Sequence, residues 1–385
     1  MIIFALGPSC RRKNILRRSV AAIAVLGLLV TPILGVAAET KTAWQADWES
    51  GLTAAQKEGR VVLYGSVVYE EIFREFQKKY PGIKVTAVTG RTPELAERIL
   101  AERRAGKFLA DLYLGGSGPA YVLLQAKALD PLKPALVLPE VTDGSKWWKG
   151  RHVYHDVERQ YILAFNGIAQ SYFSRNTKLV KANEIRSYWD LLQPKWKGKI
   201  VAMDPTMGGG VGGALQSIYL NPKLGREFLR RFLTEMDITP TRDLRQFADW
   251  LALGKFAIGA LAPPDRVGIY EAREQGLPVD VFESRSFTEG IPLSTSSGNL
   301  ALIDRAPHFY AAKVAMNWFL SREGQKVYQK AARDKDSLRI DIPKDDVLAH
   351  VRRVEGAEYM ILAGPEFQNQ DNVLKVVNEI WKSRK

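Results

Sequence analysis

The segment that decides the fold is SYWDLLQPKWKGKIVAMDPTMGGGVGGALQSIYL, which spans residues 187–220. Residues 199–203 form a short apolar run that predicts a buried strand, and helical spacing begins at Ala214. The candidate ligand-binding residues between them are Asp204, Thr206, Gly208 and Gly209. Glycine lets backbone N–H groups approach a ligand, and the unpaired N–H groups of a helix N-terminus favour an anion. The segment therefore fits a ligand-binding loop, and it fits equally an ordinary tight turn between a strand and a helix.

The residues before position 120 alternate between strand and helix patterns. The expected strands are 60–64, 83–88 and 110–114, and the expected helices are 44–57, 70–80 and 94–104. Because the connections between successive strands are short and helical, these strands are predicted to lie parallel in one sheet.

Small polar loops follow the expected strands of this sheet. In an open α/β sheet, ligands bind outside the C-terminal ends of the strands. The loops there offer backbone N–H groups, a hydroxyl or a guanidinium, and their candidate ligand-binding residues are Ser66, Arg91, Ser117 and Gly118. Each loop taken alone is also typical of an ordinary turn.

A second α/β set is expected after residue 148. Its predicted strands are 161–166, 199–203 and 256–261, and its predicted helices are 228–236 and 244–253. A strongly amphipathic helix is expected at 310–320, and residues 355–385 are expected to form a polar C-terminal helical segment.

The order of several short motifs resembles that of a known family. These motifs are YGSVVYEEIFREFQKKYPGIKV (64–85), ELAERILAERRAGKFLADLYLGGSGPAYVLLQAKALDPL (94–132), YILAFNG (161–167), YWDLLQPKWKGKIVAMDPTMGGG (188–210), GKFAIGA (254–260) and STSSGNLALIDRAPHFYAAKVAMNWFLSREGQKVYQK (294–330). In this order they resemble bacterial extracellular solute-binding proteins, the periplasmic receptors of ABC importers, in the branch related to ferric-iron-binding proteins.

The resemblance implies an α/β, two-lobed periplasmic binding protein type II fold with a hinge and a ligand cleft between the lobes. On that basis lobe 1 is expected in 39–155 and 294–345, lobe 2 in 156–293, and a C-terminal helical segment in 346–385. The hinge crossings are expected near 155–156 and 294–298.

The N-terminus has the pattern of an export signal. A positive segment with five Lys and Arg residues precedes an apolar stretch at 20–30, and the small residues Val36, Ala37 and Ala38 follow it. This pattern predicts a signal peptide over 1–38, cleaved near Ala38, and a periplasmic protein. The only cysteine is Cys10, ahead of the apolar stretch, so the mature chain is predicted to have no disulfide, thiolate metal site or lipid anchor at a cysteine.

The charge of the chain bears on its partners. The net charge is +13, and removing the five positive charges of the leader leaves about +8. Because these charges are spread along the chain without a basic repeat, nucleic acid is not an expected partner. The expected partners are a small-molecule solute and the membrane permease of an ABC importer, and the protein is expected to be a monomer.

Further candidates come from the second half of the chain. Thr241 and Arg242 stand at a predicted helix start, where a hydroxyl and a guanidinium can face an anion, and Ser297 lies in the expected hinge loop. Arg91 and Arg242 can each hold a carboxylate or phosphate with two hydrogen bonds. Asp265 can instead bind an amine, which would favour a zwitterion or a sugar.

Iron binding and catalysis are the alternatives. Ferric members of the family bind iron with adjacent tyrosines soon after the strand that resembles GKFAIGA, whereas residues 261–265 of this chain are Leu-Ala-Pro-Pro-Asp. Proline cannot supply the phenolate oxygens that a ferric ion prefers. No G-x-S-x-G motif, P-loop or strong metal-ligand spacing is present, so no catalytic residue, cofactor or metal site is predicted. The sequence predicts a periplasmic receptor that captures a small polar, anionic solute by cleft closure and delivers it to a permease. A ferric or metal-chelate binder and a secreted hydrolase are the alternatives.

Overall fold

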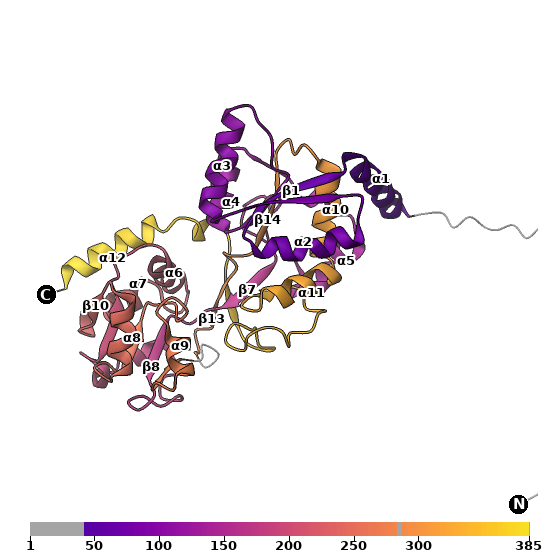
Figure 1. Ribbon diagram of the computed structural model, residues 1–385. Helices are drawn as coiled ribbons and strands as arrows, with labels where there is room; N and C mark the ends of the chain where they lie inside the picture. Colours follow the sequence, from indigo (N-terminus) through magenta and orange to yellow (C-terminus); the bar gives the residue numbers. More distant parts are fainter. Residues whose placement is uncertain (1–41, 283–286, 385) are drawn as a thin grey trace, which may run out of the picture. The chain divides into compact units, whose positions relative to one another are not determined.

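The computed structural model describes residues 42–282 and 287–384 (Figure 1). The expected signal peptide, 1–38, lies outside the described residues. No helix within the described ranges is long and apolar enough to cross a membrane. The strands form three sheets, and the first two each have helices and a hydrophobic core of their own.

The first sheet has the strand order β2-β1-β3-β14-β6-β5, with β4 paired to β14. Its strands are β1 (Arg60–Gly65), β2 (Lys84–Thr89), β3 (Leu112–Gly115), β4 (Leu129–Asp130), β5 (Val153–Tyr154), β6 (Leu163–Ala164) and β14 (Asn299–Ile303). The main helices with it are α1 (Ala43–Glu58), α2 (Val68–Lys79), α3 (Thr92–Arg104), α4 (Ser117–Gln125), α5 (Pro139–Thr142), α10 (Phe309–Leu320) and α11 (Arg322–Ala331). We call this assembly the first lobe. The predicted parallel pairing of the first three strands is confirmed.

Both faces of the first sheet are buried, which explains its continuous apolar strands. In β1, Val61 and Leu63 belong to the core that contains α2 and α10, whereas Val62 and Tyr64 belong to the core that contains α3 and α4. Alternate residues of a strand point to opposite faces, so helices on both faces require apolar residues at every position.

The second sheet has the order β10-β9-β11-β8-β12. Its strands are β8 (Phe173–Asn176), β9 (Ile200–Met203), β10 (Thr239–Thr241), β11 (Ile258–Ala260) and β12 (Val279–Val281). Its helices are α6 (Gly210–Tyr219), α7 (Gly225–Glu235), α8 (Leu244–Ala252), α9 (Ile269–Glu274) and α12 (Asp371–Ser383). We call this assembly the second lobe. The segment at 187–220 lies at its centre, because β9 pairs with both β10 and β11 and leads into α6.

A third, smaller sheet has the order β15-β7-β13-β16. Its strands are β7 (Asn166–Ala169), β13 (Ile291–Ser294), β15 (Asp336–Ser337) and β16 (Tyr359–Leu362). The chain passes between the two lobes by way of this sheet: β7 leads to β8, β12 leads to β13, and β16 leads to α12. We call β7, β13 and β16 the connecting strands.

Two predictions about elements are wrong. The strand expected at 161–166 in the second lobe is divided: β6 pairs with β14 in the first sheet, and β7 begins at Asn166. The segment expected to be helical from residue 355 instead begins with β16, which runs parallel to β13. In both cases a short apolar run takes its partner from the tertiary structure, which spacing along the chain does not reveal.

The glycine-rich segment also differs from its prediction. The helix was expected from Ala214, but α6 begins at Gly210 and includes Gly212 and Gly213. A Cβ atom on Gly212 would lie 2.1 Å from Oε1 of Gln370. Glycine at this position therefore makes room for a side chain from the C-terminal segment.

Candidate functional site

A cavity of ≈ 340 Å³ lies where the connecting strands meet the starts of α4 and α6. This volume is within the range of small-molecule sites. Its lining residues are Ser117, Ile168, Gln170, Tyr172, Gly209, Gly210, Gly213, Gln216, Pro263, Asp265, Arg266, Ser294, Ser296, Ser297, Lys335, Leu362, Phe367, Gln368 and Gln370. We call it the front cavity. Most of these side chains are neutral and polar, so the cavity can recognise a small solute by hydrogen bonds.

Serine hydroxyls from the first lobe line one side of the front cavity. Ser117 is buried at the start of α4, and its N–H donates to the carbonyl of Ser296 at 2.8 Å. The side-chain amide of Asn299 donates to the carbonyls of Gly115 and Ser296, which fixes this loop. The hydroxyl of Ser117 has no hydrogen-bond partner within the described part of the chain, so it is free to bind a ligand.

Glutamines from α6 and from the C-terminal segment form the opposite side. Gln216 donates both amide hydrogens, to the carbonyls of Glu366 at 2.6 Å and Asn369 at 2.8 Å. Gln370 donates to the carbonyl of Gly209 at 3.1 Å. Gln216 therefore has only its oxygen left for a ligand, whereas Gln370 keeps one N–H group as well as its oxygen. This side of the front cavity presents hydrogen-bond acceptors together with the remaining donor of Gln370.

A buried histidine orients a third glutamine of this wall. The side-chain amide of Gln368 lies 2.9 Å from Nδ1 of His155, and because an amide N–H only donates, Nδ1 must accept. Burial lowers the pKa of His155 to about 4, so the ring is neutral at pH 7. The proton of the neutral ring is then on Nε2, which donates to the carbonyl of Thr295 at 3.2 Å. His155 thus joins the C-terminal segment to the expected hinge loop.

Few charges line the front cavity. Asp265 and Arg266 are both exposed, with 3.8 Å between the carboxylate and Nε. Lys335 is about one-quarter exposed, and its Nζ lies 2.7 Å from Oδ2 of Asp334. Burial raises the pKa of Tyr172, which keeps its phenol protonated. Within the described ranges, no group of three His, Cys, Asp or Glu residues could hold a metal ion.

The structure brings together four of the twelve predicted ligand-binding residues, and these are Ser117, Gly209, Asp265 and Ser297. The other eight do not line the front cavity, and they are Ser66, Arg91, Gly118, Asp204, Thr206, Gly208, Thr241 and Arg242. Ser66 is half-buried at the end of β1, and Gly118 and Gly208 are each next to a lining residue.

The two arginines that were predicted to bind an anion form ion pairs with nearby carboxylates instead. Arg91 is mostly exposed and pairs with Glu94 one helical turn away. Arg242 donates to Oδ2 of Asp204 at 2.7 Å and to the hydroxyl of Thr206 at 3.0 Å. Burial raises the pKa of Asp204, but the hydrogen bonds from Thr206 and Arg242 outweigh it, and the pKa lies below its usual range. These three residues satisfy one another at the end of β9 and β10.

Thr241, the remaining predicted residue of this region, is buried, and its hydroxyl forms hydrogen bonds with residues close to it in the sequence. Its hydroxyl donates to the side-chain oxygen of Gln246 at 2.7 Å and accepts from the N–H of Asp243. Asp243 accepts from the N–H groups of Arg245 and Gln246, so it is the N-cap of α8. The predicted helix start is confirmed, but the polar groups at this position cap the helix and do not line the front cavity.

The lining residues that follow residue 331 are not predicted from the sequence. These are Lys335, Leu362, Phe367, Gln368 and Gln370. Glutamine and leucine carry no specific signal in a sequence, and residues 346–385 were expected to be helical. The only available signal was the run of glycines after β9, because so many positions without a Cβ indicate that something packs closely there.

The chain belongs to the family of bacterial extracellular solute-binding proteins, whose sequence profile matches residues 71–331. Members of this family bind small solutes and deliver them to the permeases of ABC importers. An uncharacterized protein of Haemophilus influenzae is 25% identical over 312 residues, which are 74% of this chain and 79% of that protein.

Solved structures of periplasmic binding proteins share the fold. Trichodesmium IdiA (FutA), in complex with iron and citrate, has a TM-score of 0.62 at 19% identity, and the match covers 84% of this chain and 99% of that chain. Apo FutA2 from Synechocystis has a TM-score of 0.60 at 16% identity, with the same coverage of both chains. The predicted type II periplasmic binding fold is confirmed.

Proposed function

We propose that this protein is the periplasmic component of an ABC importer and that it binds a small polar solute with an acidic group in the front cavity. Closure of the two lobes on the solute would produce the form that the permease recognises. The mature chain would begin after Ala38 and act as a monomer. The family consists of binding proteins, and the proposal assigns no catalytic role to any residue.

The observation that carries the proposal is the composition of the front cavity. Hydroxyls and the ammonium group of Lys335 can donate to an acid, and the glutamine oxygens can accept from hydroxyl or amine groups of the same solute. The starts of α4 and α6 also lie at this cavity, and helix N-termini favour negative charge. Arg91 and Arg242 do not line the front cavity, so they give no support for an acidic solute. The proposed preference for an acidic solute therefore depends on Lys335 and Arg266.

Native mass spectrometry of the mature protein from its own periplasm would identify a bound solute by mass. Calorimetric titration of that solute into Lys335→Gln should then show affinity about 10-fold to 100-fold lower, because a hydrogen bond to a charged group is worth about 1.5–3 kcal/mol. The matched control is Lys330→Gln, an exposed lysine of α11 that does not line the cavity. Unchanged affinity in Lys335→Gln would contradict the acidic solute.

Ferric iron or a ferric chelate is the second candidate, because Tyr172 and Asp265 both line the front cavity and offer a phenol and a carboxylate. The similar IdiA (FutA) structure holds iron and citrate. Ferric citrate should give a visible charge-transfer band if Tyr172 binds iron, and Tyr172→Phe should abolish that band. Binding of ferric citrate without a band would mean that the chelate binds as an anion.

A further inference from the structure

A second cavity, of ≈ 180 Å³, lies on the other face of the connecting strands. Ile168 and Gln170 line the front cavity, whereas Ala169 and Ser171 line this second one. Because successive side chains of an extended chain point to opposite sides, the two cavities are separated by the strand itself. We call the second one the rear cavity.

Two arginines share the carboxylate of Asp280, and of these Arg273 lines the rear cavity whereas Arg175 lies behind its wall. Arg273 reaches Oδ1 of Asp280 at 3.2 Å, and Arg175 reaches Oδ2 of the same carboxylate at 3.3 Å. Asp280 also accepts from the N–H of Val281 at 2.9 Å. The charge of Asp280 is therefore shared between two guanidinium groups and does not fully neutralise Arg273.

A third arginine of the wall has no acidic partner. The only hydrogen bond of the Arg352 guanidinium within the described residues is a long one, 3.4 Å, from Nη1 to the carbonyl of Lys344. No carboxylate of those residues lies within ion-pair distance of it. A half-buried guanidinium in this position has hydrogen-bond donors available for a ligand.

An aromatic pair completes the polar lining. The rings of Tyr270 and His350 are stacked with their centroids 4.0 Å apart. Neither the Tyr270 hydroxyl nor the His350 ring nitrogens have a hydrogen-bond partner among the described residues. Burial and the nearby Arg273 lower the pKa of His350, so the ring is neutral at pH 7 and can still donate one hydrogen bond.

We propose that the rear cavity is a second binding site, for a small anion with a carboxylate or phosphate group, held by Arg352 and Arg273 with hydrogen bonds from Tyr270 and His350. Planar guanidinium groups match the geometry of carboxylates and phosphates. The volume is large enough for inorganic phosphate or a short dicarboxylate but smaller than the front cavity. This site would be independent of the transported solute, because its charged residues do not line the front cavity.

The test is titration of inorganic phosphate and of succinate into the full mature protein, followed by calorimetry and by phosphorus NMR line broadening. We expect binding of at least one probe, weakened tenfold or more in Arg352→Gln. The matched control is Arg333→Gln, an exposed arginine of the same segment that does not line the cavity. Tyr270→Phe keeps the stacked ring and should weaken binding about 3-fold to 10-fold, because it removes one donor.

Lys335→Gln distinguishes this site from the front cavity. If the probe binds only in the rear cavity, its affinity is unchanged in Lys335→Gln, whatever that variant does to the transported solute. The proposal is overturned if neither probe binds at about 10 mM. It is also overturned if Arg352→Gln, folded as judged by circular dichroism, binds as tightly as wild type, or if only Lys335→Gln abolishes binding.

Discussion

The two faces of β7 differ in chemistry although they belong to the same four-residue strand. On the front face the lining is mostly hydroxyls and amides, and its few charges are exposed or paired with a neighbour. On the rear face Arg273, Arg352 and His350 surround a smaller space that has one acid, Asp280. A lining made mostly of hydroxyls and amides favours selection of a solute by its pattern of donors and acceptors, whereas guanidinium groups favour charge over shape.

Both cavities depend on the chain after residue 331, which lies outside the region that matches the family profile. This segment gives Lys335 and Gln368 to the front cavity and His350 and Arg352 to the rear cavity. The region that matches the family profile therefore supplies most of the two lobes, and the chain after residue 331 supplies lining residues to both cavities. Substitutions that destabilise the packing of this segment should lower ligand affinity at both cavities. Substitutions of a residue that lines one cavity should lower affinity at that cavity alone.

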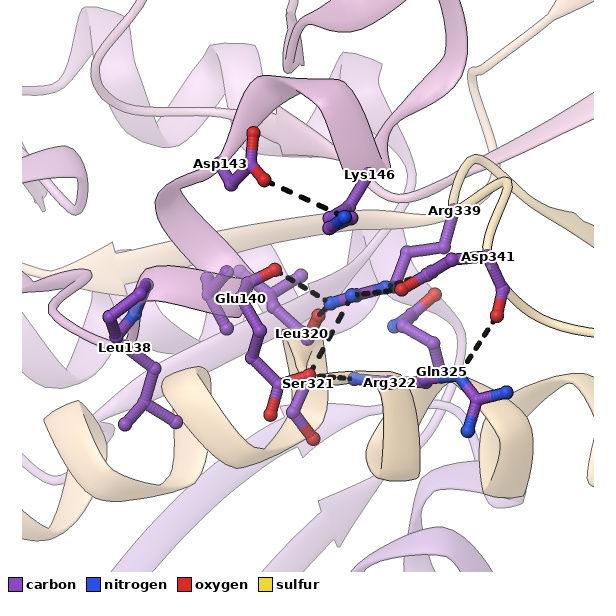
Figure 2. Close-up of polar contacts among 12 residues, drawn as sticks. Leu138, Glu140, Asp143, Lys146, Leu320, Ser321, Arg322, Gln325, Arg339 and Asp341 are labelled. Atoms are coloured by element: carbon purple, nitrogen blue, oxygen red, sulfur yellow. Dashed lines mark hydrogen bonds and ion pairs between the residues drawn. The ribbon is translucent and has the colours of Figure 1, made fainter. Parts of the chain in front are cut away.

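The largest effect is expected from Arg339, which fixes the start of this segment to the first lobe. Figure 2 shows its guanidinium bound to Asp341 and to the carbonyls of Glu140 and Leu320. The side chain is fully buried. Arg339→Met should lower the free energy of unfolding by about 3–5 kcal/mol, because it breaks a buried ion pair and leaves buried carbonyls without donors. Urea unfolding measures this change.

The matched control for Arg339 is Arg322→Met, an exposed arginine that also contacts the Asp341 residue, through its carbonyl. It should cost no more than about 1 kcal/mol. In Arg339→Met both cavities should lose affinity for their ligands. If only one cavity loses affinity, the two cavities do not both depend on the chain after residue 331.

The next effect is the pH dependence that His155 confers. Its pKa is about 4 in the folded protein, lowered by burial from the ordinary value of 6.5. The unfolded chain therefore binds a proton that the folded chain does not, and stability is lost as the pH falls from 6.5 towards 4, by up to about 3 kcal/mol. His155→Gln should be less stable than wild type at pH 7, and the difference should shrink as the pH falls.

Urea unfolding of wild type and of His155→Gln between pH 7 and pH 4 measures the difference between their free energies of unfolding. The contributions of the other titrating groups are the same in both proteins, so they cancel in this difference. A difference that stays constant with pH would show that His155 is not the buried neutral group described above. Because His155 orients Gln368, the same substitution should weaken the front cavity and leave phosphate binding at the rear cavity unchanged.

A smaller effect, confined to the front face, is expected from Gly212→Ala. The new Cβ would lie 2.1 Å from Oε1 of Gln370, so the glutamine side chain must move. Alanine favours a helix over glycine by about 0.5–1 kcal/mol, which should offset the cost of that movement. We expect nearly unchanged thermal stability, with solute affinity lowered about tenfold, the equivalent of 1.4 kcal/mol.

Gly51→Ala in α1 is the control for that experiment, since Gly51 does not line the front cavity and its Cβ would lie 3.8 Å from Cδ of Lys313, an ordinary contact distance. It should gain the same helix propensity and keep its affinity for the solute. Equal affinities in the two variants would mean that Gln370 does not contact the solute.

The sequence predicted the scaffold because local patterns determine it. Strands such as β1 and β9 have uninterrupted apolar runs, and the amphipathic helix α7 shows its periodicity directly. The helix expected at 310–320 is present as α10, but it is not amphipathic, because every residue from Ala311 to Leu320 is buried. The strands β6 and β16 were assigned wrongly because each is short and is placed in its sheet by a partner far away in the sequence, β14 for β6 and β13 for β16. For such strands, pairing in the folded protein overrides local preference.

Two of the four predicted residues that line the front cavity follow from the topology of the fold. Ser117 and Gly209 lie at helix starts beside strand ends, where α/β proteins place ligands, and both line the front cavity. Arg242 also stands at a helix start beside a strand end, but it forms an ion pair with Asp204. These two residues are 38 positions apart, and no pattern along the chain reveals that they are in contact. The glutamines of the C-terminal segment are brought to the cavity by tertiary packing alone.

The smallest effect is expected for the arginines that the sequence favoured. Arg242→Ala and Arg91→Ala should each leave solute affinity within about twofold, because neither side chain lines the front cavity and both are mostly exposed. Stability should change by no more than about 1 kcal/mol, the usual limit for exposed ion pairs. Calorimetric titration of the solute measures the first and urea unfolding the second. A tenfold loss of affinity in either variant would mean that a guanidinium reaches the bound solute when the lobes close. The front face would then recognise charge as the rear face does, and the contrast between the two faces of β7 would not hold.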